Sequence, residues 1–419
     1  MIDESVWGKI IKDYLEWNVK LVRRDIKYEI PKIQRALSII GPRRSGKTYL
    51  MFQISKELEK TRSIYVNFED PRLTGVNLQD LLKFLDTFYS MFPENVKKTN
   101  YFLLDEIQTI DKWEKFVRHL LDKNQKVILS GSSSKMLSKE ISTELRGRSI
   151  VTYVYPFSFK EILRANGLAI EKYLSTYEES KIKKLTRDYL IWGSYPEVIL
   201  NPSLRKEILT ENLNLTIYRD VVERWRVSNV KGLRLVIKML AYSSNLSISK
   251  MYNNLKGLGM EIGKTTVANY LEYLMDSMIF YKLYPYVKSY KKQEMLGFKS
   301  YLIDNGLLTV LGVEDNSRLL ENMVFLELLK RGYETNKNLF YYLTKNGEEI
   351  DFLIKERERI RLIETTYNID RKHVKKMFTA LNEIDSKTGI IITWDYEDEI
   401  DKDGKKITCL PLWKWLLSS

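Results

Sequence analysis

Short apolar runs alternate with amphipathic segments along the first part of the chain. In chain order, these runs and segments cover residues 36–40, 49–60, 63–68, 78–92, 101–104, 113–123 and 126–130. Short strands that alternate with helices predict a parallel sheet covered on both faces, so we expect an α/β unit. We expect this unit to end near residue 157 and a helix with a basic end to precede it at residues 1–29.

Helical periodicity dominates from there to about residue 225, with a loop at Trp192–Glu197. A different rhythm follows, in which three short helices come before two apolar runs joined by a basic turn. The helices are expected at 231–244, 247–259 and 263–277, the apolar runs at 278–287 and 297–305, and the turn at 288–296. The pattern predicts a small module of three helices and a β-hairpin.

A last module begins near Ser317 with a helix, which strand pairs, another helix and a final strand follow. This order again predicts α/β structure. We therefore expect four parts: an α/β core at 1–160, a helical segment at 161–228, the middle module at 229–314 and a C-terminal α/β module at 315–419.

Composition narrows the class of protein. The 419 residues are 44% hydrophobic and 29% charged, which is typical of a folded chain of several domains. One cysteine, Cys409, and two distant histidines, His119 and His373, argue against a disulfide framework or a Cys/His metal site. The polar N-terminus and the lack of an apolar stretch of about 18 residues predict no membrane span and a cytoplasmic location. The net charge of +13 favours polyanions, although a lysine-rich proteome produces the same value.

A glycine-rich loop follows the first apolar run. Residues 41–48 fit the pattern G-x-x-x-x-G-K-[ST] without a departure, and the strand–loop–helix context argues against a chance match. In this pattern the backbone N–H groups surround the β-phosphate, the lysine reaches the β- and γ-phosphates, and the threonine binds Mg²⁺. The sequence therefore predicts ATP and Mg²⁺ as cofactors. The residues expected to bind the nucleotide are Gly41, Pro42, Arg43, Arg44, Ser45, Gly46, Lys47, Thr48 and Tyr49.

An acidic pair at the end of the third apolar run completes the expected site. Asp105 would hold Mg²⁺ together with Thr48, and Glu106 would act as the general base on the attacking water. The alternative is a pair that only ends a strand. The fourth run leads into Ser130–Ser133, where a polar side chain could sense the γ-phosphate, and Ser132 is our first choice.

Residues 36–160 resemble the AAA+ ATPase core of an archaeal and bacterial family whose P-loop reads G-P-R-R-x-G-K-T. The resemblance extends to the segments Gly131–Ser134, Gly147–Arg148 and Pro156–Phe159. It implies a catalytic arginine late in the core that completes the site of a neighbouring copy, and hence a homo-oligomer. Arg148 is the candidate, with Arg146 second, unless both are ordinary surface residues.

The middle module has the pattern of a winged helix, and the family resemblance extends to it. Its third helix, about Lys264–Ser277, would enter the major groove of DNA. The residues expected to contact bases are Lys264, Thr265, Thr266 and Asn269. Those expected to contact phosphates are Lys288, Lys291, Lys292 and Lys299. A winged helix can also dock proteins, and this alternative stays open.

The C-terminal module resembles the PD-(D/E)xK nuclease core. The resemblance rests on Glu321 or Glu327 on a helix, followed by Asp351 and Glu364 on strands. In an active nuclease of this kind Asp351 and Glu364 would bind a divalent metal, and a lysine two positions after Glu364 would activate water. Thr366 occupies that position, so the module is expected to be degenerate unless another lysine compensates. The candidates for such a lysine are Lys345 and Lys372.

Three functions fit these features. The first is an ATPase whose nucleotide state changes how the basic modules bind duplex or branched DNA. The second is an ATP-driven regulatory switch that recruits a protein partner. The third is an ATP-dependent DNA nuclease.

Overall fold

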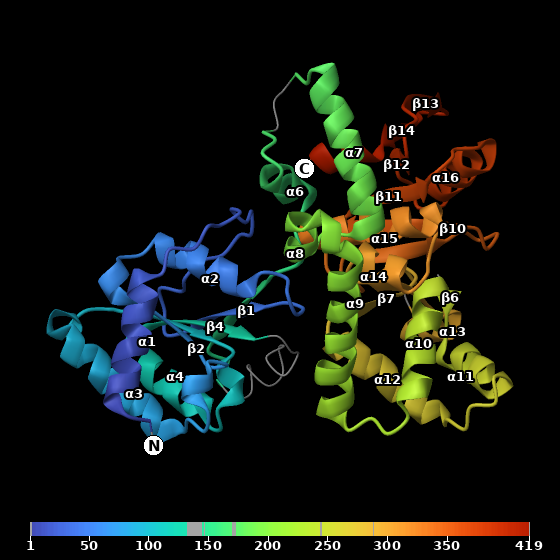
Figure 1. Ribbon diagram of the computed structural model, residues 1–419. Coiled ribbons are helices and arrows are strands. Elements are labelled where there is room, and N and C mark those ends of the chain that lie inside the picture. The colour runs from blue at the N-terminus through green and yellow to red at the C-terminus, as the bar shows by residue number, and fades with distance from the viewer. Residues whose placement is uncertain are drawn as a thin grey trace. The chain divides into compact units, whose positions relative to one another are not determined.

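The computed structural model describes residues 2–131, 145, 147–169, 173–243, 245–287 and 289–418. The chain divides into two compact units, Met1–Tyr155 and Pro156–Ser419, coloured blue to teal and green to red in Figure 1. The expected boundary at residue 160 falls close to this division. The boundaries at 228 and 314 lie inside the second unit and stay predictions.

The first unit is built on a five-stranded parallel sheet with the strand order β2-β3-β4-β1-β5 (Figure 1). The strands are β1 Ala36–Ile40, β2 Ser63–Asn67, β3 Tyr101–Asp105, β4 Lys126–Gly131 and β5 Ser149–Tyr153. The helices are α1 Glu4–Glu16, α2 Lys47–Lys56, α3 Leu78–Met91 and α4 Trp113–Asp122. Every residue of β1 is buried, as expected of a central strand with helices on both faces. The predicted α/β core is confirmed.

The expected N-terminal helix at 1–29 is wrong beyond Glu16. The apolar stripe of α1 ends at Tyr14, and Trp17 already has an extended backbone. The segment that follows lies along α2 instead, where the ammonium of Lys56 donates to the carbonyl of Val19 at 2.7 Å. The apolar side chains of this segment pack against the core of the first unit, which explains why the pattern looked amphipathic. Those side chains belong to Val19, Leu21, Ile26, Tyr28 and Ile30.

The second unit begins with helices. These are α6 Phe159–Ala165, α7 Thr176–Trp192, α8 Pro196–Leu200, α9 Arg205–Leu215 and the π-helix η7 Thr216–Glu223. The loop Trp192–Glu197 is held by Asp304, whose carboxylate accepts hydrogen bonds from the backbone N–H of Ser194 at 2.7 Å and of Gly306 at 2.9 Å. Gly193 has a positive φ of 73°, and a Cβ there would lie 1.7 Å from Asp304. The loop is therefore part of the packing of the second unit.

Four helices and a three-stranded antiparallel sheet follow. The elements are α10 Val230–Tyr242, β6 Asn245–Leu246, α11 Ile248–Gly257, α12 Lys264–Asp276, β7 Phe280–Leu283, α13 Tyr290–Leu296 and β8 Phe298–Leu302. The predicted hairpin is confirmed, since β7 pairs antiparallel with β8 in the strand order β6-β8-β7. The predicted basic turn between them is wrong. It contains the short helix α13, which begins after Ser289 because that side chain accepts a hydrogen bond from the N–H of Lys292.

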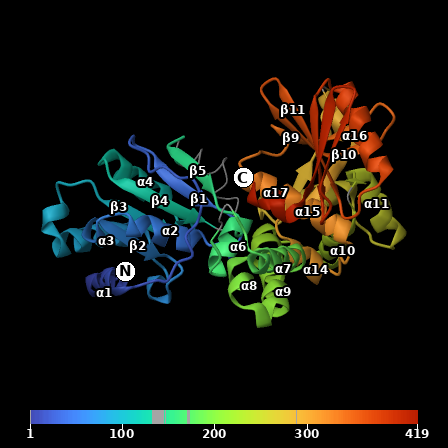
Figure 2. The same ribbon diagram turned by 90° about the horizontal axis from the view of Figure 1, so that it is seen from above.

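The C-terminal part is a six-stranded mixed sheet with the order β13-β14-β12-β11-β10-β9, seen on the right of Figure 2. Its strands are β9 Leu339–Leu343, β10 Glu349–Glu356, β11 Arg359–Thr366, β12 Thr388–Thr393, β13 Asp398–Lys402 and β14 Lys405–Pro411. Its helices are α14 Asn305–Val310, α15 Asn316–Lys330, α16 Arg371–Glu383 and α17 Leu412–Leu417. Phe325 on α15 contacts Phe352 on β10, while Met377 and Leu381 on α16 pack on other residues of the sheet. The expected separate α/β module is confirmed.

Among the described residues, no helix is long and apolar enough to cross a membrane.

Candidate functional site

The glycine-rich loop connects the end of β1 to the start of α2. Gly46 has a φ of 95° and caps α2, a backbone conformation that favours glycine. Gly41 packs so closely that a Cβ there would lie 2.1 Å from the carbonyl oxygen of Val154. Lys47 is buried, and its ammonium donates to the carbonyl oxygens of Gly41 at 3.1 Å and Pro42 at 3.0 Å. The loop thus curls around the lysine at the N-terminus of a helix, an arrangement suited to an anion.

Asp105 lies at the end of β3 and is 2% exposed. One oxygen of its carboxylate, Oδ2, accepts hydrogen bonds from the hydroxyls of Thr48 at 2.7 Å and Tyr65 at 2.8 Å. The other oxygen, Oδ1, accepts from the hydroxyl of Ser130. Burial raises the pKa of Asp105 although these three hydroxyls oppose the shift. The structure therefore brings together Thr48 and Asp105, the two residues expected to bind the metal.

Glu106 follows in a left-handed backbone conformation, with a φ of 54°. Its N–H donates to the hydroxyl oxygen of Ser130 at 3.3 Å, and its carboxylate accepts from the amide of Gln108. A non-glycine residue with a positive φ is strained, and such strain is common at functional sites. This conformation of Glu106, the expected general base, ends the strand β3.

Ser130 is the serine that the structure places at Asp105. Ser132, our first choice from the sequence, lies outside the described residues, and so does Arg146. Ser130 belongs to β4 and is the first residue of the stretch Ser130–Ser133 in which the sequence predicted a sensor. The pairing of β3 with β4 selects the residue, because Leu104 and Leu129 are partners in the register and the next residues, Asp105 and Ser130, are therefore neighbours.

Two further residues of the first unit contact the site and were missed. Tyr65 on β2 bonds Asp105, as described above. Arg24 is 4% exposed, and its guanidinium donates to the carbonyl oxygens of Ser45 at 2.8 Å and Tyr155 at 2.7 Å. Arg24 thus ties the glycine-rich loop to the last residue of the first unit. The basic pair Arg23–Arg24 was visible in the sequence, but nothing there indicated which arginine is buried.

Four predicted residues of the core remain. Arg43, Arg44 and Arg148 are half-buried, and Tyr49 is exposed. Tyr49, on the first turn of α2, is 52% exposed. Arg148 precedes β5 and forms a 2.5 Å ion pair with Asp122. The backbone of Arg148 bonds Ala36, the first residue of β1, whereas the glycine-rich loop leaves from the last residue of that strand. Arg148 therefore lies at the opposite end of β1 from Lys47.

Most residues expected to contact DNA are accessible. Lys264 and Thr265 at the start of α12 are exposed, and Thr266 and Asn269 are half-buried. Lys291 and Lys292 on α13 are exposed. Lys288 lies outside the described residues.

The prediction for Lys299 is wrong. Its side chain is 1% exposed, so it cannot contact a phosphate. It lies on β8 with its ammonium 2.6 Å from Glu321, 2.8 Å from Glu349 and 2.8 Å from Asp351. The basic run suggested a solvent-exposed wing, but every residue of β8 is buried, Lys299 included.

The expected nuclease-like residues meet around that lysine. Asp351 and Glu364 are neighbours on β10 and β11, and Glu321 on α15 contacts the same lysine as Asp351. Glu327 points elsewhere and bonds Tyr189 and Lys330. Among the described residues, the second lysine that pairs with the cluster is Lys376, at 2.5 Å from Glu364, instead of Lys345 or Lys372.

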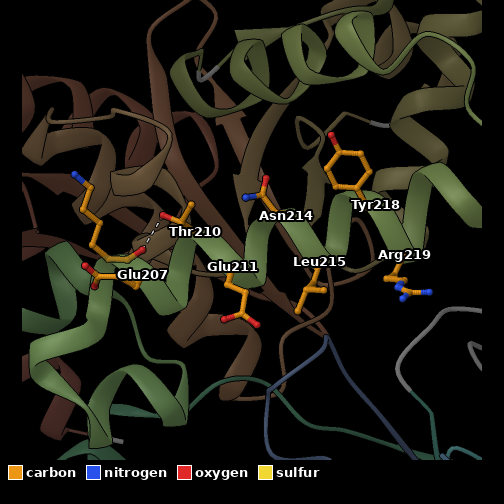
Figure 3. Close-up of a pocket in the computed structure, with 8 residues that line it drawn as sticks. Glu207, Thr210, Glu211, Asn214, Leu215, Tyr218 and Arg219 are labelled. Atoms are coloured by element: carbon orange, nitrogen blue, oxygen red, sulfur yellow. Dashed lines mark hydrogen bonds between the residues drawn. The ribbon is translucent and has the colours of Figure 1, made fainter.

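A surface hollow with a volume of about 640 Å³ lies along α9 and η7 (Figure 3). It is lined by Lys206, Glu207, Thr210, Glu211, Asn214, Leu215, Tyr218 and Arg219. All of these residues belong to one continuous helical segment, so the hollow is an open groove without polar groups converging from several elements. We assign it no chemistry.

Comparison with known proteins agrees with this geometry. Residues 34–163 match the family model of an AAA domain, and residues 183–317 and 316–415 match two domains of unknown function, DUF8612 and DUF4143. The first unit is thus a P-loop ATPase core of the AAA+ type.

Relatives extend over the whole chain. The uncharacterized protein MJ1544 of Methanocaldococcus jannaschii is 37% identical over 437 residues, which cover 100% of this chain and 97% of the relative. The chain belongs to the same family as this protein. An uncharacterized protein of Haemophilus influenzae is 29% identical and covers 90% of this chain, or 93% of its own length.

Among solved structures, a Walker-type ATPase of Pyrococcus abyssi, PABY2304, is similar at a TM-score of 0.45 and 15% identity. The similarity covers 75% of this chain and 96% of that one. It is too low to support an argument about function.

Proposed function

We propose that the first unit hydrolyses ATP in a Mg²⁺-dependent reaction. The observation that carries the proposal is the pair of Thr48 and Asp105, joined at 2.7 Å directly behind the glycine-rich loop. A hydroxyl and a carboxylate are hard oxygen ligands of the kind that Mg²⁺ prefers. Because Asp105 is buried among neutral donors and its pKa is raised, a cation beside it would relieve the cost of its charge.

Substrate binding would exchange internal contacts for contacts to phosphate. Lys47 would release the carbonyl oxygens of Gly41 and Pro42 and turn to the β- and γ-phosphates. The backbone N–H groups of the loop and the N-terminus of α2 would receive the same anion. Thr48 and Asp105 would hold Mg²⁺, which would supply electrostatic stabilisation of the phosphate charge.

Glu106 is proposed to orient the attacking water and to accept its proton. Ser130 donates to Asp105 and accepts from the N–H of Glu106, so one hydroxyl fixes both acidic residues. In our proposal this serine takes the role that the sequence suggested for Ser132.

Arg148 is proposed to act in a second copy of the chain. It lies at the end of β1 opposite Lys47, so it is badly placed for its own site. It is 40% exposed and would have to leave its ion pair with Asp122. Under this proposal Arg148→Ala lowers the turnover of concentrated protein about 100-fold or more, whereas dilution lowers the turnover of the wild type per molecule.

We further propose that ATP turnover is coupled to DNA binding by the middle module. The proposal takes α10, α11, α12 and the β6-β8-β7 sheet as a winged helix, and Lys264 and Thr265 at the start of α12 are exposed. Lys291 and Lys292 on α13 would contact phosphates, which is consistent with the net charge of +13. The proposal includes no DNA cleavage, because lysines occupy the acidic cluster of the C-terminal sheet.

One observation favours a protein partner instead. The segment between β7 and β8 contains the helix α13 instead of an extended wing loop. Met295 on this helix is 76% exposed. An exposed methionine on a helix suits contact with a protein better than contact with a phosphate backbone.

ATP hydrolysis measured with and without duplex, branched and single-stranded DNA separates these functions. We expect stimulation by one DNA form, no turnover by Lys47→Ala, and loss of stimulation in the double variant Lys291→Gln/Lys292→Gln. Lys402→Gln, an exposed lysine on β13, is the matched control and should be stimulated like the wild type. Turnover that ignores every DNA, with no DNA binding, would favour the protein-directed switch. Turnover that survives in Lys47→Ala would overturn the ATPase proposal itself.

A further inference from the structure

Lys299 lies at the centre of four carboxylates of the second unit. Its ammonium contacts Oε1 of Glu321 at 2.6 Å, Oε1 of Glu349 at 2.8 Å and Oδ1 of Asp351 at 2.8 Å. The fourth carboxylate, Glu364, accepts from the N–H of Asp351 at 3.3 Å and pairs with Lys376. A buried ammonium can form three hydrogen bonds, and all three are made here to charged oxygens.

The remaining bonds of the cluster also come from the protein. Oδ2 of Asp351 accepts from the N–H of Thr365 at 2.8 Å and from the hydroxyl of the same residue at 2.6 Å. Oε1 of Glu321 accepts from the hydroxyl of Tyr301 at 2.7 Å. Both oxygens of Asp351 are therefore bonded within the chain.

The contacts in this cluster shift the pKa values of its charged groups. Burial alone would lower the pKa of Lys299, but Asp351, Glu321 and Glu349 raise it well above its usual value. At Asp351, burial would raise the pKa, but Lys299, Thr365 and Lys376 together lower it below its usual value. At Glu364, burial and the neighbouring Asp351 raise the pKa. The lysine is thus held as a cation, and its charge is balanced by carboxylates on two elements of the C-terminal part, α15 and β10.

We propose that Lys299 is the built-in cation of this carboxylate site, holding the position that a divalent metal ion would otherwise take. The ammonium contacts three carboxylate oxygens at 2.6–2.8 Å, as a metal ion would at shorter distance. It cannot act as a Lewis acid or lower the pKa of a bound water. Lys299 therefore excludes a metal ion from the site. The role of the site is to join β8 to β10.

Lys299 also connects two parts of the second unit. The lysine belongs to β8 of the three-stranded sheet, while its partners belong to α15 and to β10 of the six-stranded sheet. A stacked contact between Tyr301 on β8 and Phe325 on α15, with 4.0 Å between ring centroids, lies in the same region. Through Lys299, the middle module and the C-terminal sheet of the second unit are held to each other by buried charge. Among the described residues, no group of three or more His, Cys, Asp or Glu is arranged to hold a metal ion.

The test compares Mn²⁺ binding and thermal stability in the nucleotide-free chain. Free Mn²⁺ is measured by its EPR signal. The wild type and Lys299→Gln have the same nucleotide site, so Mn²⁺ bound there does not contribute to the difference between the two proteins. We expect Lys299→Gln to bind one more Mn²⁺ than the wild type. Its Tm should lie about 10 °C lower without metal and rise with Mn²⁺, whereas the Tm of the wild type should not respond through this site.

Two further variants keep the test decisive if Lys299→Gln folds poorly. Lys299→Gln/Asp351→Asn removes one charge of each sign, so it should regain part of the lost Tm and lose the extra Mn²⁺. The control is Lys406→Gln, at a half-buried lysine on β14 of the six-stranded sheet that pairs with Glu399, and it should resemble the wild type. Mn²⁺ bound by the wild type and lost in Asp351→Asn would overturn the proposal. A Tm of Lys299→Gln equal to that of the wild type would overturn it as well.

Discussion

The nucleotide site and the Lys299 site each hold a buried aspartate at the point where a metal ligand was expected, but the two aspartates have different neighbours. Asp105 is surrounded by the hydroxyls of Thr48, Tyr65 and Ser130, and burial raises its pKa. Asp351 contacts the ammonium of Lys299, which lowers its pKa.

This difference is the basis for the proposal that the first site, and not the second, takes a cation. Neutral donors orient a carboxylate without cancelling its charge, so the charged form stays costly and gains from a positive ion. A lysine cancels the charge within the chain and leaves little to gain. Two similar acidic patterns therefore have opposite chemistry, and the partner of the aspartate decides between them.

The largest effect is expected at Glu106. Glu106→Gln removes the proposed proton acceptor, so kcat should fall by about 100-fold or more while the Kd for ATP changes little. Steady-state hydrolysis and the binding of a fluorescent ATP analogue measure the two quantities. Glu399→Gln, at an exposed glutamate of β13, is the control. A kcat of Glu106→Gln within threefold of the wild type would exclude Glu106 as the base.

Stability separates the two aspartates directly. Asp351→Asn leaves Lys299 short of a charged partner, and we expect the free energy of unfolding to drop by about 3 kcal/mol. Asp105→Asn removes a charge that burial already disfavours, so the free energy of unfolding should change by less than about 1 kcal/mol, or rise. Urea denaturation of both variants measures the difference. Equal losses would show that the two environments do not differ as described.

Asp304 is a third buried aspartate to compare with Asp105 and Asp351. Its carboxylate accepts hydrogen bonds chiefly from backbone N–H groups. Burial raises its pKa from 3.8 to about 6. Between about pH 4 and 6 the native chain therefore keeps a proton that the unfolded chain has released. The stabilisation from this proton is complete below about pH 4 and is lost as the pH rises through about 6.

Asp304→Asn should remove this dependence, which amounts to roughly 2–3 kcal/mol for a shift of this size. The measurement is the free energy of unfolding from urea curves at several pH values between about 4 and 7. The wild type should lose stability relative to Asp304→Asn as the pH rises across this range. A constant difference between the two proteins would contradict the assignment.

The smallest effect is expected at Arg24. Arg24→Ala removes two hydrogen bonds from a charged donor to the carbonyl oxygens of Ser45 and Tyr155. We expect the KM for ATP to rise about tenfold, with a smaller change in kcat, because the loop loses its support. The neighbouring exposed Arg23→Ala is the matched control. A lower Tm with unchanged KM would mean that Arg24 only stabilises the fold.

Local sequence patterns were enough to predict several helices and strands. The motif at residues 41–48 specifies a strand, a loop and a helix within one short segment, because glycines and the following helix act on neighbouring backbone groups. The helix expected from Lys264 onwards and the antiparallel β7–β8 hairpin are also present, since their periodicity is local. The α/β class follows from the same alternation of short runs.

The sequence by itself thus determined the class of the core, the position of the glycine-rich loop and the acidic residue behind it. Only the tertiary structure decided that Ser130 and Arg24 contact this site and that Lys299 faces carboxylates instead of solvent. The reason is physical. A lysine in a basic run has the same local pattern whether it is solvated or buried, and its environment is set by partners such as Asp351, 52 residues away in the chain. Charge compensation between distant strands depends on how the strands pack, and no local spacing encodes it.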